Sequence, residues 1–210
     1  MGPPGVGKGT QAARLAAHLG VPHVSTGDIL REAVAGGSTL GRRVRPVLES
    51  GQLVTDDLMA EVIQDRLGRD DARRGFVLDG YPRTLPQVEL LDGVLSRLGV
   101  ALDRVFLLRA PEEEIVRRIS GRRVCPACKA VYHIESRAPR SAGVCDACGS
   151  ALVQRRDDTE ELVRERLRVY AGKTLPAVAA YGERGMVREI DATGEPAAVF
   201  SRLASELAEA

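Results

Sequence analysis

The sequence predicts an α/β fold with a doubly wound parallel sheet. Apolar runs such as 75–79 and 105–108 are short and rich in branched side chains, which is typical of strands buried on both faces of a sheet. Segments with apolar residues at helical spacing follow these runs along the chain. Strands that alternate with helices form parallel sheets, because each helix carries the chain back to the start of the next strand.

The composition is that of an ordinary globular protein of 210 residues, enough for one domain with insertions. The net charge is +1, although only three of the 30 basic residues are lysines. A charge this close to zero offers no bulk attraction to nucleic acid or to a membrane surface. The sequence has neither an apolar run of membrane-spanning length nor a signal-peptide pattern. We therefore expect a cytoplasmic monomer without nucleic-acid or membrane partners.

The chain opens on a glycine-rich loop, GPPGVGKGT at residues 2–10. Gly2 and Gly7 stand five apart, and Lys8 follows directly. Glycine lets successive backbone N–H groups point inward at a phosphate, and a lysine here reaches the β and γ phosphates of a nucleotide. The helix expected after the loop adds its N-terminus to the anion site. A glycine-rich turn that only caps a helix is the alternative, and the hydroxyl expected directly after the lysine comes one residue late, at Thr10.

A phosphate loop needs a strand before it, yet only Met1 precedes Gly2. In a doubly wound sheet that strand is central, so its loss would leave buried N–H and C=O groups unpaired, at about 1–3 kcal/mol each. Several such groups would exceed the roughly 5–15 kcal/mol by which a domain is stable. We therefore expect the natural protein to begin upstream with a short Val/Ile/Leu-rich strand, and Met1 to be an internal methionine.

Residues 25–54 predict a small helical insertion after the second strand. The first helix ends at Gly20, and the extended residues 21–24 follow it. Asp28 is expected to cap the next helix, and Thr55 with Asp56 caps a later one. The helices expected in the first 67 residues cover 11–19, 28–34, 40–48 and 56–67.

The strand at 75–79 ends in Asp79, which a Gly-Tyr-Pro-Arg turn at 80–83 follows. An acidic residue at the carboxyl end of such a strand is well placed to hold Mg²⁺ through water. The helix at 85–98 carries Gln87 in its first turn.

Pro111 opens the helix after the strand at 105–108. This helix is expected to bear both Arg118 and Arg122, which stand four residues apart and so share one face. The last elements are expected to be a helix at 159–170 that bears Arg166, a strand at 186–190 before Asp191 and Gly194, and a helix at 196–208.

All four cysteines fall in one short segment, as two CxxC pairs separated by 16 residues. Each pair offers two thiolates to a tetrahedral metal, and two pairs complete its shell. Because four thiolates leave no open position, the metal is expected to be structural Zn²⁺, with iron left open. A redox CxxC is the main rival. The expected ligands are Cys125, Cys128, Cys145 and Cys148.

Several motifs occur in the order found in adenylate kinases. They are GPPGVGKGT at 2–10, STGDILR at 25–31, QLVTD at 52–56, DGYPRT at 79–84, GRRVC at 121–125 and RRDDTEELVRERL at 155–167. The chain resembles this family over nearly its whole length, and its cysteine pairs are similar to the zinc-bearing lid of the long bacterial form. The resemblance implies a P-loop NTPase core that transfers a phosphoryl group reversibly between Mg-ATP and AMP, giving two ADP.

The resemblance also implies particular residues for each substrate. The ATP site would comprise Gly5, Val6, Gly7, Lys8, Gly9, Thr10, Arg118, Arg122, Val131, Tyr132 and Gly194. The AMP site would comprise Thr26, Arg31, Gln52, Leu53, Val54, Gly80, Tyr81, Pro82, Arg83, Gln87, Arg155 and Arg166. Charge around the migrating group would come from Lys8, Arg83, Arg122, Arg155 and Arg166, and the carboxylates orienting these arginines would be Asp157 and Asp158. Tyr81 stands where the family more often has phenylalanine.

The resemblance divides the chain into three parts. The P-loop core would take residues 1–24, 55–120 and 159–210, the helical insertion that binds the monophosphate 25–54, and the zinc-binding lid 121–158. Both inserted parts would close over the nucleotides and exclude water, which would otherwise accept the phosphoryl group.

Two other functions stay open at this stage. A kinase for another nucleoside monophosphate would share the phosphate machinery, although the amide of Gln87 matches an adenine edge. A zinc-ribbon nucleic-acid binder with a regulatory NTPase is the second. The near-zero net charge and the lack of an aromatic stacking cluster in the sequence speak against it.

Overall fold

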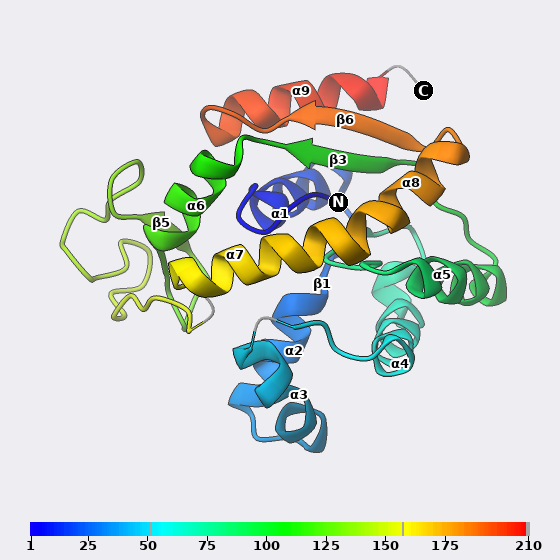
Figure 1. Ribbon diagram of the computed structural model, residues 1–210, viewed down its shortest axis with the longest axis horizontal. Helices are drawn as coiled ribbons and strands as arrows, with labels where there is room; N and C mark the ends of the chain where they lie inside the picture. The colour runs from blue at the N-terminus through cyan, green and yellow to red at the C-terminus, as the bar shows by residue number, and fades with distance from the viewer. Residues whose placement is uncertain (51, 157, 209–210) are drawn as a thin grey trace.

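The computed structural model describes residues 1–50, 52–156 and 158–208. Figure 1 shows a core of strands and helices, a helical pair below it and a loop-rich lid at the left. In the described part of the chain, no helix is both long and apolar enough to cross a membrane.

The core strands form two parallel pairs. β1 (His23–Ser25) pairs with β2 (Val77–Asp79), and β3 (Val105–Arg109) pairs with β6 (Val187–Asp191). The parallel pairing confirms the fold class predicted from the sequence. Met1 lies against β3, since the N–H of Leu108 donates to the Met1 carbonyl at 3.0 Å.

The register of β1 and β2 decides which side chains meet at the carboxyl edge. Ser25 lies opposite Asp79, and Thr26 follows directly as the first residue of the next helix. Because parallel strands end at the same edge, this register brings the acidic end of β2 beside the start of the helical pair.

Helices cover both sides of these strands (Figure 1). α1 packs against α9, which lies along β6, and α5 packs against both α4 and α8. Leu91 of α5 and Ile63 of α4 are fully buried in one apolar cluster, where full burial of such a side chain contributes about 1.5–3 kcal/mol. The bounds are α1 Lys8–Leu19, α4 Asp56–Leu67, η1 Asp70–Ala72, α5 Leu85–Leu98, α6 Glu112–Ser120, α8 Leu175–Glu183 and α9 Pro196–Ala208.

One long helical stretch links the lid to the core. α7 (Glu160–Val169) continues through a π-helical turn, Tyr170–Thr174, into α8 without a loop between them. In Figure 1 this stretch crosses the front of the molecule from the lid to the far side of the core. A side chain on α7 is therefore held in a defined position relative to the core.

The helical pair consists of α2 (Thr26–Ala35) and α3 (Thr39–Glu49). The prediction that Asp28 caps this first helix was wrong: Ser25 is the N-cap, and its hydroxyl accepts the N–H of Asp28 at 3.3 Å. Both residue types are good caps, and the carboxylate of Asp28 is instead paired with Arg31. The predicted start of α4 after Thr55 is confirmed.

The lid contains a small antiparallel sheet. β4 (Arg122–Val124) pairs with β5 (Val131–His133), and isolated bridges join Val124 to Val153 and Val144 to Ala151. These few backbone contacts arrange the two cysteine-bearing turns side by side. The expectation that one helix carries both Arg118 and Arg122 was wrong: α6 ends at Ser120, and the backbone of Arg122 pairs with β5 instead.

Gly41 is the contact point between α2 and α3. A Cβ at this position would lie 1.9 Å from the carbonyl oxygen of Ala33, which is backbone and has little freedom to move. We predict that Gly41→Ala destabilises the protein by about 1–3 kcal/mol, because the two helices must separate. Thermal denaturation measures this loss.

The matched control is Gly182→Ala in α8. A Cβ there meets nothing within 4 Å, so alanine should stabilise the helix by up to about 1 kcal/mol. Equal melting temperatures for Gly41→Ala and wild type would contradict the close packing of α2 on α3.

Candidate functional site

The glycine-rich loop has the backbone geometry of an anion cradle. Gly5 and Gly7 have φ angles of +76° and +100°, which side chains other than glycine rarely adopt. Gly7 is the N-cap of α1, so the first N–H groups of the helix face the loop. Val6 is buried in the core and anchors the loop, whereas Gly9 and Thr10 lie at the start of the helix.

Lys8 lies inside this loop and is surrounded by other cations. Its Nζ donates to the carbonyls of Gly2 and Pro3 at 2.8 and 2.7 Å. The pKa of Lys8 is lowered to about 7, chiefly by burial; the charge of Asp79 opposes the decrease, and the charges of Arg83, Arg166 and Arg122 add to it.

Asp79 is the anionic group beside this cation cluster. Its Oδ2 lies 3.4 Å from Nε2 of His23 on the neighbouring strand, and its backbone carbonyl accepts the hydroxyl of Thr26 at 3.2 Å. Burial opposes ionisation of Asp79, but the contact with His23 and the charges of Lys8 and Arg83 hold its pKa below the ordinary value. A Cβ on Gly9 would lie 3.3 Å from Oδ2, so glycine gives this carboxylate room.

Two of the predicted arginines share one buried carboxylate. Asp158 is fully buried, and both of its oxygens accept hydrogen bonds from Arg122, one of them from Nε at 2.8 Å. Arg166 of α7 lies 3.5 Å from the same carboxylate. Asp158 therefore joins the base of the lid to the long helix. Asp157, the second predicted carboxylate, lies outside the described residues.

The turn after β2 positions Arg83. Nε of Arg83 donates to the carbonyl of Gly80 at 2.7 Å, and the backbone carbonyl of Arg83 accepts the hydroxyl of Thr174 at 3.0 Å. The turn contains a cis peptide bond between Tyr81 and Pro82. Arg83 is thus held by its own turn and by the π-helical segment.

The helical pair contributes the other predicted side chains on this side. Burial opposes ionisation of Asp28, but the hydrogen bond and charge of Arg31 and, more weakly, the charge of Arg155 hold its pKa below the ordinary value. Gln52 donates to Glu165 of α7 at 2.8 Å. Leu53 is half-buried, and Val54 is buried in the core cluster.

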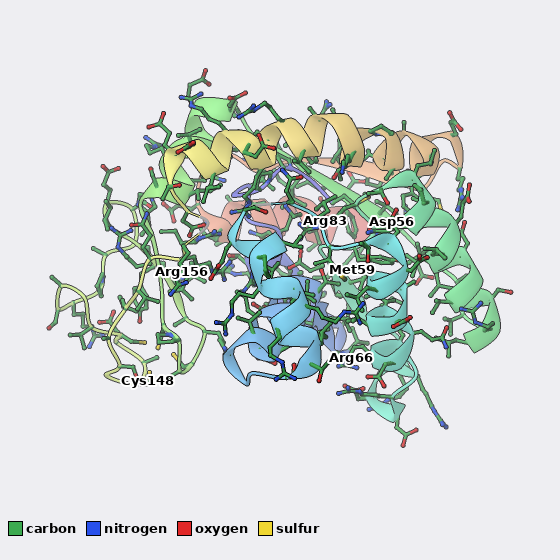
Figure 2. The ribbon with its side chains drawn as sticks, turned by 60° about the horizontal axis from the view of Figure 1, so that its bottom comes forward. Asp56, Met59, Arg66, Arg83, Cys148 and Arg156 are labelled. Atoms are coloured by element: carbon green, nitrogen blue, oxygen red, sulfur yellow. The ribbon has the colours of Figure 1, made fainter. Side chains whose placement is uncertain are left out.

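The lid and the helical pair touch each other. Arg156 pairs with Glu49 of α3 at 2.8 Å, and Lys129 lies 3.9 Å from Glu32 of α2. Figure 2 shows Arg156 between the lid loops and the helical pair. The described conformation therefore has these two parts in contact at their rims.

Arg118 joins α6 to the loop after β6. Its Nη1 donates to the carbonyl of Ala192 at 2.9 Å, two residues before Gly194, whose φ is +83°. A cavity of about 710 Å³ opens at the carboxyl ends of β3 and β6 nearby. It is lined by residues 109–111, 189–191 and 193.

The four cysteines form one cluster in the lid, near the label of Cys148 in Figure 2. Their sulfur atoms lie within 4.8 Å of one another, with closest pairs at 3.4 Å for Cys125 with Cys148 and 3.5 Å for Cys128 with Cys145. These separations are too long for disulfide bonds and fit the edges of a tetrahedron of thiolates around Zn²⁺. Cys125 and Cys145 are buried, which favours a structural centre.

Tyr132 supports this cluster from within the lid sheet. Its hydroxyl lies 3.5 Å from the sulfur of Cys145 and accepts the N–H of Asp146 at 2.9 Å. Val131, its neighbour in β5, is paired with Val124 of β4. Val131 and Tyr132, two of the residues expected at the ATP site, thus belong to the same sheet as the cysteine turns.

The sequence alone did not single out His23, Thr174 or the contact between Asp56 and Gln87. His23 lies beside Asp79 only because β1 and β2 are neighbours in the sheet. Asp56 was expected as part of a helix start, and its carboxylate also accepts the amide of Gln87 at 2.8 Å. Asp56 belongs to the QLVTD motif, but nothing in that motif indicates that Gln87 is its partner.

Comparison with known proteins gives one consistent family. The family model of adenylate kinase matches residues 1–186. An adenylate kinase of Kosmotoga olearia is 49% identical over 99% of this chain and 96% of its own length. An adenylate kinase of Anaeromyxobacter sp. (strain Fw109-5) is 49% identical over 96% of this chain and 94% of its own length. That of Finegoldia magna is 44% identical over 99% of this chain and 96% of its own length. The chain therefore belongs to the adenylate kinase family, the phosphotransferases that convert ATP and AMP into two molecules of ADP.

Proposed function

We propose that Lys8, Arg83, Arg122 and Arg166 surround the phosphoryl group as it passes between ATP and AMP. The supporting observation is that these cations, from four separate segments, converge: the three arginines all lower the pKa of Lys8. Phosphoryl transfer requires in-line positioning and neutralised charge rather than covalent chemistry by the protein. Arg155 adds a fifth positive charge on the side of the helical pair, near Asp28.

In the reaction the P–O bond between the γ phosphorus and the bridging oxygen of ATP breaks as an oxygen of the AMP phosphate bonds to the γ phosphorus. Positive groups that already point at this position stabilise the spreading negative charge without reorganising, which is the largest single contribution in such sites. Asp158, and by the family resemblance Asp157, would keep Arg122 and Arg166 aimed at it.

The two substrates would approach from opposite sides of this charge cluster. ATP would lie on the glycine loop, clamped by Arg118 and Arg122, with its adenosine near Val131, Tyr132 and the backbone at Gly194. AMP would lie between the helical pair and the turn after β2, in contact with Thr26, Arg31, Gln52, Leu53, Val54, Gly80, Tyr81, Pro82, Arg83, Gln87, Arg155 and Arg166. Within this arrangement residues 25–54 and 121–158 would act as two flaps over the core formed by 1–24, 55–120 and 159–210.

Mg²⁺ would enter with ATP and neutralise oxygens of the β and γ phosphates. Asp79 fits as its water-bridged carboxylate, because it is ionised, almost fully enclosed and next to Lys8. The contact with His23 would keep this carboxylate in place.

Zn²⁺ would occupy the four-cysteine cluster as a structural ion with a complete shell. Its role would be to hold the loops of the lid together, since the lid sheet consists of short strands. We also propose that the enzyme works as a monomer in the cytoplasm, a reducing compartment that keeps cysteines as thiols available to a metal.

A coupled assay for ADP formed from ATP and AMP with Mg²⁺ tests the activity directly. Replacing AMP by UMP, CMP or GMP separates an adenylate kinase from a kinase for another monophosphate. We expect AMP to be the preferred acceptor by a wide margin.

Lys8 should take up a proton when ATP binds. Because its pKa is about 7 in the free protein, the amine is mostly neutral at pH 8, and nearby phosphates raise the pKa so that the charged form returns. We expect uptake of about one proton per site at pH 8 and little at pH 6, where the amine is already charged. Calorimetry in two buffers of different ionisation enthalpy measures this number.

Lys8→Met is the control for that titration and should abolish the uptake at pH 8. Binding heats that are the same in both buffers at pH 8 for the wild-type protein would contradict the low pKa of Lys8.

Arg83→Ala should lower turnover strongly while the protein stays folded. Loss of one charge contact in the transition state costs on the order of 3–4 kcal/mol, or a hundredfold or more in kcat. The coupled assay measures the rate, and circular dichroism checks the fold. Arg74→Ala, an exposed arginine just before β2, should leave the rate unchanged. An Arg83→Ala enzyme within a few-fold of wild type would remove Arg83 from the site.

Cys145→Ser should lower both the metal content and the melting temperature, because a structural metal contributes its binding energy to folding. Activity at low temperature should largely survive, since the cluster lies in the lid and not at the cation cluster. Ser141→Ala in the same lid should change neither property. Immediate loss of activity on chelation, with the fold intact and Mg²⁺ restored, would show instead that the metal takes part in the reaction.

A further inference from the structure

Gln87 makes two hydrogen bonds of opposite sense with its side-chain amide. The side chain is only 2% exposed, in the first turn of α5. Its Oε1 accepts the backbone N–H of Arg83 at 2.7 Å, and its Nε2 donates to Oδ1 of Asp56 at 2.8 Å. Figure 2 labels Asp56 and Arg83, the two partners of this amide.

These two partners leave the amide a single orientation. A backbone N–H only donates, and a carboxylate oxygen only accepts. A rotation of the amide by half a turn would set two N–H groups against each other at Arg83 and two oxygens against each other at Asp56. The assignment of oxygen and nitrogen in Gln87 therefore follows from the network itself.

Asp56 is held in place by a second contact. It is the first residue of α4, and the same Oδ1 accepts the hydroxyl of Thr84 at 2.9 Å. Thr84 is in turn the N-cap of α5, the helix that carries Gln87. The carboxylate thus joins the first turns of two helices, and neither it nor the amide is free to rearrange alone.

An oriented amide distinguishes purine bases by hydrogen-bond sense. After its two internal bonds, Gln87 retains one lone pair on Oε1 and one N–H on Nε2. Adenine offers the complement, a donor at its 6-amino group beside an acceptor nitrogen, whereas guanine and hypoxanthine present an acceptor O6 beside a donor N1–H. An amide that cannot turn over fits the first pattern and opposes the second.

We propose that Asp56 is a positioning residue that sets the choice of base at the monophosphate site, by holding the amide of Gln87 in the sense that accepts adenine and rejects 6-oxopurines. This inference rests on the proposed role of Gln87 beside the AMP base. Of the two hydrogen bonds that orient the amide of Gln87, the one to the charged carboxylate of Asp56 is the stronger. Hydrogen bonds to ionised groups are worth roughly twice those between neutral groups.

The test compares AMP with IMP, which carries O6 and N1–H where AMP carries the amine and N1. The measured quantity is the ratio of kcat/KM for AMP to that for IMP, with ATP as donor. In Asp56→Asn the new side chain either donates or accepts, so it no longer selects one orientation. We expect the ratio to fall about tenfold or more, through a higher KM for AMP and a lower KM for IMP, with some selectivity left by Arg83.

Asp57→Asn is the matched control, since it removes the same charge from the next, exposed residue of α4 and should leave the ratio unchanged. Asp56→Ser is a second variant in case the first folds poorly, because a hydroxyl also donates or accepts. Asp56→Glu keeps a carboxylate and should retain more of the selectivity. Calorimetric binding of AMP and IMP checks that the change lies in binding of the base.

The outcomes are distinct. A wild-type enzyme that does not phosphorylate AMP would overturn the proposed function itself. A second outcome is a wild-type enzyme that prefers AMP, while Asp56→Asn and Asp56→Ser lower the rates for AMP and IMP by the same factor or not at all. This outcome would leave the proposed function standing and overturn the role of Asp56. A fall in the AMP/IMP ratio of kcat/KM in Asp56→Asn, but not in Asp57→Asn, supports the role of Asp56.

Discussion

The site depends on holding positive charges together near one half-buried amine. Lys8, Arg83, Arg122 and Arg166 repel one another, and in surroundings with less water this repulsion is screened less than in bulk solvent. The pKa of Lys8, at about 7, reflects burial first and this repulsion second. The protein offsets part of it with two carboxylates, the half-buried Asp79 beside the loop and the fully buried Asp158 beside the lid. The phosphates of the two nucleotides would supply the remaining negative charge.

The fold brings these charges together from four directions. The glycine loop places Lys8 at the start of α1, and the turn after β2 places Arg83. Arg122 stands at the base of the lid, while Arg166 reaches in from α7, which runs on through the π-helical turn into the core. Asp158 contacts Arg122 of the lid and Arg166 of α7, so one carboxylate joins the lid to the long helix.

Two places in the structure depend on a few directional contacts. With a bound metal the four cysteines would hold together a lid whose described part contains a small sheet. On the other side, Asp56 and Thr84 connect two helix starts around Gln87. In both places a few polar contacts stabilise an arrangement that apolar burial alone does not specify, because hydrogen bonds and metal ligation are directional and hydrophobic contacts are not.

The sequence by itself determined the fold class, the phosphate loop, the cysteine cluster and the family, because each depends on residue types at short, regular spacings. Helix and strand periods, the two glycines around Lys8 and the CxxC pairs are all local patterns. Only the tertiary structure decided that Ser25 rather than Asp28 caps α2, that His23 lies beside Asp79 and that Asp56 faces Gln87. Those contacts join residues whose positions depend on strand register and helix packing. Where two caps or two partners have similar local energy, the packing of the helices and strands decides which one forms.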